Sequence, residues 1–282
     1  MAKAFSVASW NVEHFQSQGT RTRVDDVVGF LTAQKPDVLA VYEVEGADIW
    51  RDLVDRMRGY SFFITEGQNT QEILLGTSPS ITAFVTQKIE FQSRDAYMRP
   101  GALMTVRLAG VDYTMLFLHL ASQPDARGFG LRTDMVDRAF SFKQKVMEPV
   151  AARLGYAEPN FLFLGDLNSM GLDYVYGREP APRAKLRHLR ASEEDEISRL
   201  HFEADRVGMR VLTKSRAETW RSTRFRSNLD HVVAAKHLRF RQFGGAEVDV
   251  RGWPELATEA EQRDWITRYS DHALLYFEVQ KT

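Results

Sequence analysis

Six apolar runs in the sequence adjoin polar side chains that can bind cations or phosphate. Carboxylate and amide oxygens are the ligands that Mg²⁺ prefers, and a histidine paired with a carboxylate can transfer protons or stabilise charge. Taken singly, an Asn or Asp at a strand end most often starts a turn, and a lone histidine is more often a core residue. Six such ends in one chain favour a shared site at one rim of a sheet structure. The polar residues are Asn11, Glu43, His119, Asp166 with Asn168, Asp230 with His231, and Asp271 with His272.

The apolar runs beside these residues are strand-like, and stretches of helical periodicity separate several of them. Helices are predicted over 21–33 and 134–154, and a third is expected to begin at Ser192, which has capping-box spacing to Asp195. We therefore predict one α/β domain over residues 1–282, built from two packed sheets flanked by helices. Strands are predicted at 5–10, 38–42, 81–85, 103–106, 113–118, 161–164, 229–233 and 274–279, and long polar loops at 66–80, 120–130, 169–191 and 244–268.

The composition excludes several classes of chemistry. A chain of 282 residues can bury a sizeable core without covalent staples. It contains no cysteine, which excludes disulfides, thiolate metal sites and a cysteine nucleophile. No apolar run approaches the length of a membrane span, and the first residues lack the pattern of a signal peptide. A cytoplasmic protein is therefore expected.

Charge is unevenly distributed along the chain. The formal net charge is -1, yet the stretch 178–241 holds 16 Lys/Arg and 9 Asp/Glu, a balance of +7 that leaves -8 for the remainder. A basic stretch on a nearly neutral protein suits a polyanionic substrate that is bound on one side. A solvated helix face would explain the same charges equally well.

Together, the polar motifs resemble those of the endonuclease/exonuclease/phosphatase (DNase I-like) superfamily. The resemblance implies a four-layer α/β sandwich in which two packed mixed β-sheets are flanked by helices. Two departures concern the rim where substrate would bind: Tyr42 stands where the family usually has Gln, and the stretch 67–80 lacks the usual small-residue strand. The matching motifs are Trp10-Asn11, Glu43, His119-Leu120, Gly165-Asp166-Leu167-Asn168, Asn228-Leu229-Asp230-His231 and Ser270-Asp271-His272.

The resemblance also implies a role for each motif residue. Glu43, with Asn11 and Asp271, is expected to bind Mg²⁺, for which Mn²⁺ is a common substitute. His272 is expected to act with Asp230, which would orient its ring. Three further residues are assigned to water and phosphate: Asp166 would hold the attacking water, and Asn168 and His119 would donate hydrogen bonds to phosphate oxygens. Whether Asp166 or His272 removes the proton stays open.

An arginine-rich stretch precedes Asp230 and could contact phosphates that flank the cleaved bond. Arg221, Arg224 and Arg226 are predicted to bind substrate there, because the guanidinium group suits phosphate. Trp220 and Phe225 could stack on a base. For Trp220, a place in the core is the favoured interpretation, since large aromatic side chains are usually mostly buried.

These observations predict a metal-dependent phosphoric ester hydrolase, and most specifically an endonuclease whose substrate is nucleic acid, with DNA preferred. The alternative is a phosphomonoesterase or lipid phosphodiesterase on the same scaffold, similar to inositol phosphatases or sphingomyelinases, which sequence separates poorly from a nuclease. A non-catalytic binding module is disfavoured because no motif position is missing. The type of nucleic acid, endo- against exo-action, the number of metal ions and the oligomeric state are left open.

Overall fold

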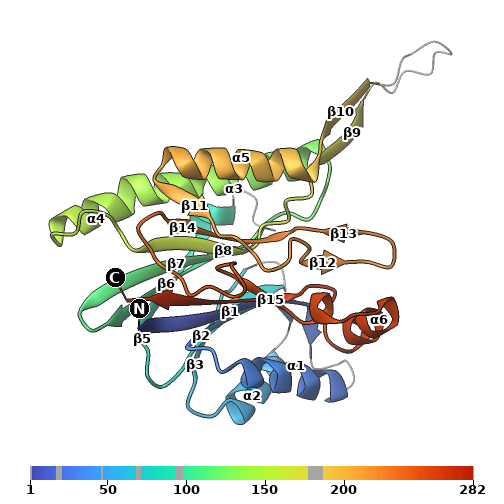
Figure 1. The fold of residues 1–282 in the computed structure, drawn as a ribbon, viewed down its shortest axis with the longest axis horizontal. Helices are drawn as coiled ribbons and strands as arrows, with labels where there is room; N and C mark the ends of the chain where they lie inside the picture. Colours follow the sequence, from blue (N-terminus) through green and yellow to red (C-terminus); the bar gives the residue numbers. More distant parts are fainter. Residues whose placement is uncertain are drawn as a thin grey trace.

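Two six-stranded sheets lie face to face, with helices on both outer surfaces (Figure 1). The computed structural model describes residues 2–16, 21–45, 47–67, 71–92, 98–176 and 187–281. The architecture is the predicted four-layer α/β sandwich. In order across the first sheet, the strands are β15 (Asp249–Arg251), β16 (Leu274–Gln280), β1 (Lys3–Gln16), β2 (Val38–Glu45), β4 (Glu72–Thr77) and β3 (Ser61–Ile64). Those of the second sheet are β11 (Met209–Val211), β14 (Asp230–Ala235), β8 (Phe161–Asp166), β7 (Val111–His119), β6 (Gly101–Leu108) and β5 (Thr82–Lys88).

The helices cover the two outer faces through separate apolar clusters. Val24, Val27 and Leu31 pack under the first sheet, and Met135 and Phe140 pack over the second. A third cluster fills the space between the sheets. None of the helices in the described ranges is long and apolar enough to cross a membrane. The helices are α1 (Arg21–Gln34), α2 (Ala47–Arg56), α3 (Ala126–Phe142), the π-helical segment Lys143–Met147, α4 (Glu148–Arg153), α5 (Glu193–Arg206) and α6 (Glu259–Arg268), with 3₁₀ turns at Ile89–Gln92 and Trp253–Glu255.

Two strand–helix–strand units explain why polar residues gather at one edge. β1 and β2 are parallel and joined through α1, and β7 and β8 are parallel and joined through α3 and α4. Parallel strands end at the same edge of a sheet, so the residues that follow them become neighbours. His119, for instance, lies directly opposite Asp166, and Asp166 lies opposite Asp230 of the antiparallel β14.

All eight predicted strands are present, and Ser192 and Asp195 form the predicted capping box at the start of α5. The helix predicted over 134–154 is wrong in its bounds: α3 begins at Ala126, where Asp125 caps it, and a π segment separates it from α4. Asp125 was hidden inside a stretch predicted to be a loop.

Two of the predicted loops contain core elements. The stretch 66–80 includes β4, whose three apolar residues are too few to give a period, although pairing with β2 and β3 buries them. The stretch 244–268 includes β15 and α6, a mostly polar helix. Within 169–191, β9 (Leu172–Tyr176) and β10 (Arg187–Ala191) form a projecting hairpin (Figure 1), and residues 177–186 lie outside the described ranges.

Gly165, beside the site, should tolerate no side chain. Its φ is +137°, and a Cβ there would lie 2.1 Å from the Leu118 carbonyl oxygen and 2.7 Å from the Tyr42 hydroxyl. Gly165→Ala is expected to lower the free energy of unfolding by about 3 kcal/mol or more, through backbone strain and overpacking. Gly130→Ala, on the open face of α3, is the control and should raise it by about 0.5–1 kcal/mol. Urea unfolding measures both, and equal effects would contradict the prediction.

Candidate active site

The carboxyl ends of the central strands surround one open cleft of about 420 Å³. Asn11 and Asp230 are buried at its edge, where their hydrogen bonds reach lining residues. Segments from both sheets, and positions separated by more than 250 residues of sequence, therefore meet at one place. The cleft is lined by Glu13, His14, Glu43, Ser122, Asp166, Asn168, Met170, Trp220, Ser227, Leu229, Asp271 and His272.

Asn11 links a carboxylate of each sheet. Its Nδ2 donates to Glu43 Oε1 at 3.0 Å and to Asp166 Oδ2 at 2.9 Å. Its Oδ1 accepts from the Glu13 backbone amide at 3.0 Å. Since an amide oxygen has two lone pairs, one remains for a cation or for water. The predicted neighbours Asn11, Glu43 and Asp166 are thus brought together.

Glu43 has a strained backbone conformation within β2. Its φ is +61°, a conformation that non-glycine residues rarely adopt. The pairing register of β2 with β4 shifts between Val41 and Val44, and such irregularities re-aim side chains at functional sites. The His14 backbone amide donates to Glu43 Oε2 at 3.0 Å. Backbone strain at this position therefore directs the carboxylate into the cleft.

His272 is held between two buried carboxylates. Its Nδ1 lies 2.9 Å from Asp230 Oδ2, and its Nε2 lies 3.7 Å from Asp166 Oδ2. Burial opposes the charged ring, but the charges of Asp230 and then Asp166 raise the pKa of His272 well above its usual value. Burial also raises the pKa of Asp166 to about 7. The ring is thus fixed with Nε2 toward the cleft and favoured as a cation.

The segment that carries His272 is fastened to β1. Ser270 Oγ donates to the Asn11 carbonyl at 2.8 Å and accepts from the His272 amide at 3.1 Å. Trp10 Nε1 donates to the His272 carbonyl at 2.9 Å. The serine of the Ser-Asp-His motif and the tryptophan of the Trp-Asn motif therefore position the chain.

Two predicted hydrogen-bond donors lie beside Asp166. Asn168 has φ +49°, and its backbone amide donates to Asp166 Oδ1 at 3.0 Å. Its side-chain Nδ2 donates to the Leu120 carbonyl at 3.1 Å. The second N–H of the side-chain amide is left available for a phosphate oxygen. His119 Nε2 lies 3.5 Å from Asp166 Oδ2 and 3.6 Å from Glu43 Oε1. Burial, followed by the charges of Arg99 and His272, holds the pKa of His119 well below its usual value. A neutral His119 can donate one hydrogen bond into this region.

Asp271 has an unsatisfied oxygen in the cleft wall. Its Oδ2 accepts from Trp220 Nε1 at 2.6 Å, whereas its buried Oδ1 has no hydrogen-bond partner among the described residues. A buried polar atom without a partner is costly, and a cation would satisfy it. The core interpretation of Trp220 is wrong, because the side chain is half-buried and lines the cleft.

Two of the three predicted substrate arginines, Arg221 and Arg226, have other partners in the structure. Arg221 is buried, and its guanidinium donates to Glu259 and Gln262 of α6. Arg226 donates to the same two residues, and neither arginine lines the cleft. Their charge is used to attach hairpin β12 (Trp220–Arg221)–β13 (Arg226–Ser227) to α6. Arg224 is exposed in that hairpin, so for Arg224 phosphate binding stays a prediction.

Several residues at the site escaped the sequence analysis. Glu13 and His14 line the cleft with positive φ values, which no sequence pattern indicated. Arg99 is buried; burial lowers its pKa, and the nearby charges of Glu43 and Asp166 oppose that shift.

The unusual Tyr42 lies in the floor of the site. Its hydroxyl lies 3.1 Å from Ser9 Oγ, and its ring packs edge-on against His119 with 6.0 Å between centroids. Tyr42 thereby fills space beside Gly165. Where the family usually has Gln, the Tyr42 ring therefore packs beneath His119. The carboxylates Glu43, Asp166 and Asp271 still line the cleft.

Two groupings of side chains could hold a divalent cation. Asp166, Asp230 and His272 carry ligand atoms within 4.8 Å of one another. Their close approach is already explained by the hydrogen bond from His272 Nδ1 to Asp230, which occupies atoms that a cation would need. Glu43 and Asp271 offer oxygen ligands and an unsatisfied atom instead, which suits Mg²⁺ better.

Comparison with known proteins agrees with this arrangement. The model of the Endonuclease/Exonuclease/phosphatase family matches residues 8–272, whereas no curated protein matches the sequence. Among solved structures, Danio rerio TDP2 complexed with a single-strand DNA product has a TM-score of 0.68 at 15% identity, covering 98% of this chain and 99% of that chain. ANGEL2, a 2',3'-cyclic phosphatase, has a TM-score of 0.61 at 17% identity, with 98% and 96% covered.

A mannosyl-6-phosphatase of Bacteroides thetaiotaomicron has a TM-score of 0.58 at 13% identity, covering 98% of this chain and 100% of that chain. At such identities the three likenesses establish the fold, and the printed activities differ from one another. The match of the family model over nearly the whole chain carries the assignment. This chain belongs to the Endonuclease/Exonuclease/phosphatase family, which indicates a phosphoric ester hydrolase.

Proposed function

We propose that this protein hydrolyses phosphodiester bonds in DNA with the help of a divalent cation. The charge of the cleft carries the proposal. Glu13, Glu43, Asp166 and Asp271 line it, and no lysine or arginine is found among its described lining residues. A phosphate entering such a cleft would meet strong repulsion. A cation bound between the carboxylates and the phosphate removes that repulsion.

Glu43 and Asp271 are proposed to hold the cation, with the free lone pair of Asn11 Oδ1 contributing directly or through water. When bound, a hard cation such as Mg²⁺ neutralises charge on the phosphate and polarises a phosphoryl oxygen. The protein positions these ligands in advance, through the strained backbone of Glu43 and the bond from Trp220 to Asp271. The one buried site oxygen without a hydrogen-bond partner among the described residues, Asp271 Oδ1, would be satisfied by this single cation.

The remaining residues are proposed to act on water and on phosphate oxygens. Asp166 holds the attacking water, because Asn11 and the Asn168 amide fix both of its oxygens. His272, held by Asp230, presents Nε2 to the phosphate and stabilises the charge that develops there. Asn168 and His119 donate further hydrogen bonds from the side of the second sheet. Proton removal by Asp166 fits this division of roles better than removal by a protonated His272.

Features around the cleft support a nucleic acid as substrate. Trp220 lines the cleft, and Phe225 is 69% exposed in the same hairpin as the exposed Arg224. Aromatic faces with nearby arginine are typical of single-strand binding surfaces. Hairpin β9–β10 begins two residues after Met170 of the cleft and projects outward (Figure 1). The complex of D. rerio TDP2 with single-strand DNA product shows that this fold accommodates DNA in one relative.

A substrate panel tests the proposal. Circular plasmid, linear single-stranded DNA, RNA, a 2',3'-cyclic nucleotide, a sugar phosphate and sphingomyelin are incubated with Mg²⁺, Mn²⁺ or EDTA. We expect DNA to be cut with either cation and to stay intact in EDTA, and nicking of the circular plasmid would establish endonuclease action. Hydrolysis of the monoester, cyclic or lipid substrates alone would contradict DNA as substrate. Undiminished hydrolysis in EDTA would contradict the cation.

A further inference from the structure

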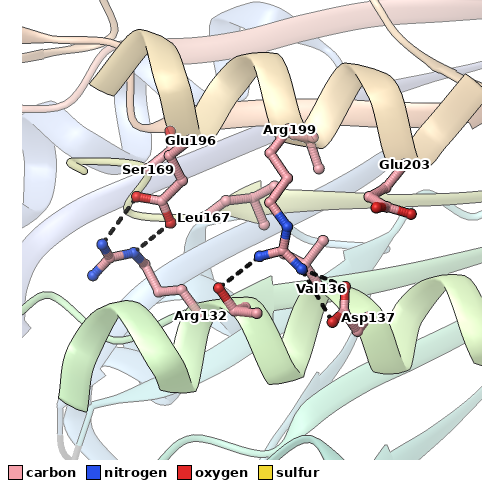
Figure 2. A pocket seen from close by; sticks show the side chains of 10 residues that line it. Arg132, Val136, Asp137, Leu167, Ser169, Glu196, Arg199 and Glu203 are labelled. Carbon is pink, nitrogen blue, oxygen red and sulfur yellow. Dashed lines mark hydrogen bonds and ion pairs between the residues drawn. The ribbon is translucent and has the colours of Figure 1, made fainter. Parts of the chain in front are cut away.

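A buried ion pair behind the cleft joins the two helices of the second sheet. Arg132 of α3 is 1% exposed, and its Nε and Nη2 donate to the two carboxylate oxygens of Glu196 of α5 at 2.8 and 2.9 Å (Figure 2). The same helix pair carries a second ion pair, in which Arg199 donates to Asp137 at 3.1 Å and to Thr133 at 2.7 Å. Both pairs hold the helices together, but only the first also contacts the loops of the site.

Arg132 uses every N–H that a guanidinium offers. Besides its two bonds to Glu196, its Nη1 donates to the carbonyls of Ala121 at 3.2 Å and Gln123 at 2.7 Å, and its Nη2 donates to the carbonyl of Gly171 at 2.6 Å. The five N–H groups of the planar guanidinium therefore each donate to a different acceptor oxygen. Lysine, with three donors on a tetrahedral nitrogen, cannot reproduce this set.

The three carbonyls belong to the two loops that carry the phosphate-facing residues. Ala121 and Gln123 follow His119 at the end of β7 and flank Ser122, which lines the cleft. Gly171 follows Asp166, Asn168 and Met170 after β8.

Glu196 completes the connection from the other helix. Its Oε2 also accepts from the Gly171 backbone amide at 2.8 Å. Gly171 has φ +78°, and a Cβ there would lie 2.4 Å from the Ala191 carbonyl oxygen, so the backbone fits closely at this point. The ion pair thus holds Gly171 through both its carbonyl and its amide.

We propose that Arg132 and Glu196 are positioning residues that fix the His119 loop against the Asp166–Asn168 loop. The two loops are also joined by the β7–β8 pairing, by backbone hydrogen bonds from Leu120 to Asp166 and from Asp173 to Pro124, and by the side-chain bond from Asn168 to the Leu120 carbonyl. Among these contacts, the Arg132–Glu196 pair adds three bonds to loop carbonyls and one to a loop amide. The pair acts from behind the cleft, where it does not touch substrate. The expected fall in kcat rests on the proposed function, whereas the expected displacement of His119 rests on the fold alone.

Arg132→Lys keeps the charge opposite Glu196 but leaves carbonyls in the loops without donors. We expect kcat for DNA hydrolysis to fall about 10- to 100-fold with KM changed less than about threefold, since small misplacement of catalytic groups affects the chemical step most. Glu196→Gln, which retains an acceptor for the Gly171 amide, should lower kcat less. Two variants serve as controls. Arg199→Ala removes the neighbouring ion pair, and Lys143→Met removes a buried ammonium group that donates hydrogen bonds to Glu148 and to the Val207 carbonyl. Both should leave kcat within about twofold of wild type.

Nuclear magnetic resonance of ¹⁵N-labelled histidine rings gives a readout that does not depend on activity. The His119 signals should move in Arg132→Lys and stay in place in Arg199→Ala, even if the protein proves inactive on DNA. The proposal is overturned if Arg132→Lys keeps both kcat and the His119 signals, or if the two controls lose as much activity at equal thermal stability. Should neither Arg132→Lys nor Glu196→Gln fold, the pair serves stability alone, which overturns it as well.

Discussion

His272→Ala is expected to lower kcat for DNA hydrolysis about 10²- to 10⁴-fold, the usual range for removal of a positioned acid–base group. Nε2 of the ring is the cleft-facing atom, and its Nδ1 is occupied by Asp230 at 2.9 Å. The fold should survive, because the backbone around it is fastened by Ser270 and Trp10 instead of by the ring.

Asp230→Asn should also lower kcat, since an amide cannot stabilise the charged ring as a carboxylate does. The double variant should be little slower than His272→Ala alone, because the two residues act as a unit. His237→Ala, a surface histidine bonded to Asn160 beyond the far end of β14, is the matched control and should be unaffected. A folded His272→Ala protein with near wild-type turnover, as judged by circular dichroism and initial rates, would remove this residue from the mechanism.

Asp271→Asn is expected to weaken cation binding while the protein stays folded. Asparagine can keep the acceptor for Trp220 Nε1 but replaces the unsatisfied Oδ1 with an amide nitrogen. The cation concentration that gives half-maximal rate should rise about tenfold or more, which corresponds to the loss of one charged ligand worth about 1.4 kcal/mol. The rate at saturating Mg²⁺ should fall less than the rate at low Mg²⁺.

Thermal unfolding measures the same interaction without substrate. A cation that binds only the folded protein stabilises it by RT ln(1 + [cation]/Kd), so at one Mg²⁺ concentration the Tm of the wild type should rise more than that of the weaker-binding Asp271→Asn. Without cation, the variant should be at least as stable as wild type, since one negative charge among the cleft carboxylates is gone. Asp112→Asn, a carboxylate paired with Arg107 at the far end of β7, controls for a general charge effect. An equal Mg²⁺ response in wild type and Asp271→Asn would contradict the assignment of Asp271 as a ligand.

The sequence by itself determined the chemistry-bearing residues and the strands that place them. The run 161–164 is apolar at every position and fully buried, so the strand and the polar residues that follow it can be recognised without a structure. Parallel pairing then brings Asn11 close to Glu43 in one sheet and His119 beside Asp166 in the other, and the packing of the two sheets brings the two pairs together. The four-layer sandwich is predicted from the resemblance of the motifs to a known family, and the structure confirms it.

Tertiary structure alone decided which polar groups face the cleft and which hold the scaffold. Arg221 and Arg132 are both arginines near motif residues, yet each is buried against a glutamate from a distant helix, and no local pattern reveals such a partner. Trp220 could have been core by its size, but Asp271 Oδ2 gives its indole N–H a hydrogen-bond partner at the cleft. Strand β4 has three apolar residues and forms only because β2 and β3 satisfy its backbone. Local sequence sets the propensity of each segment, whereas partners far along the chain determine the burial and hydrogen bonding that fix its role.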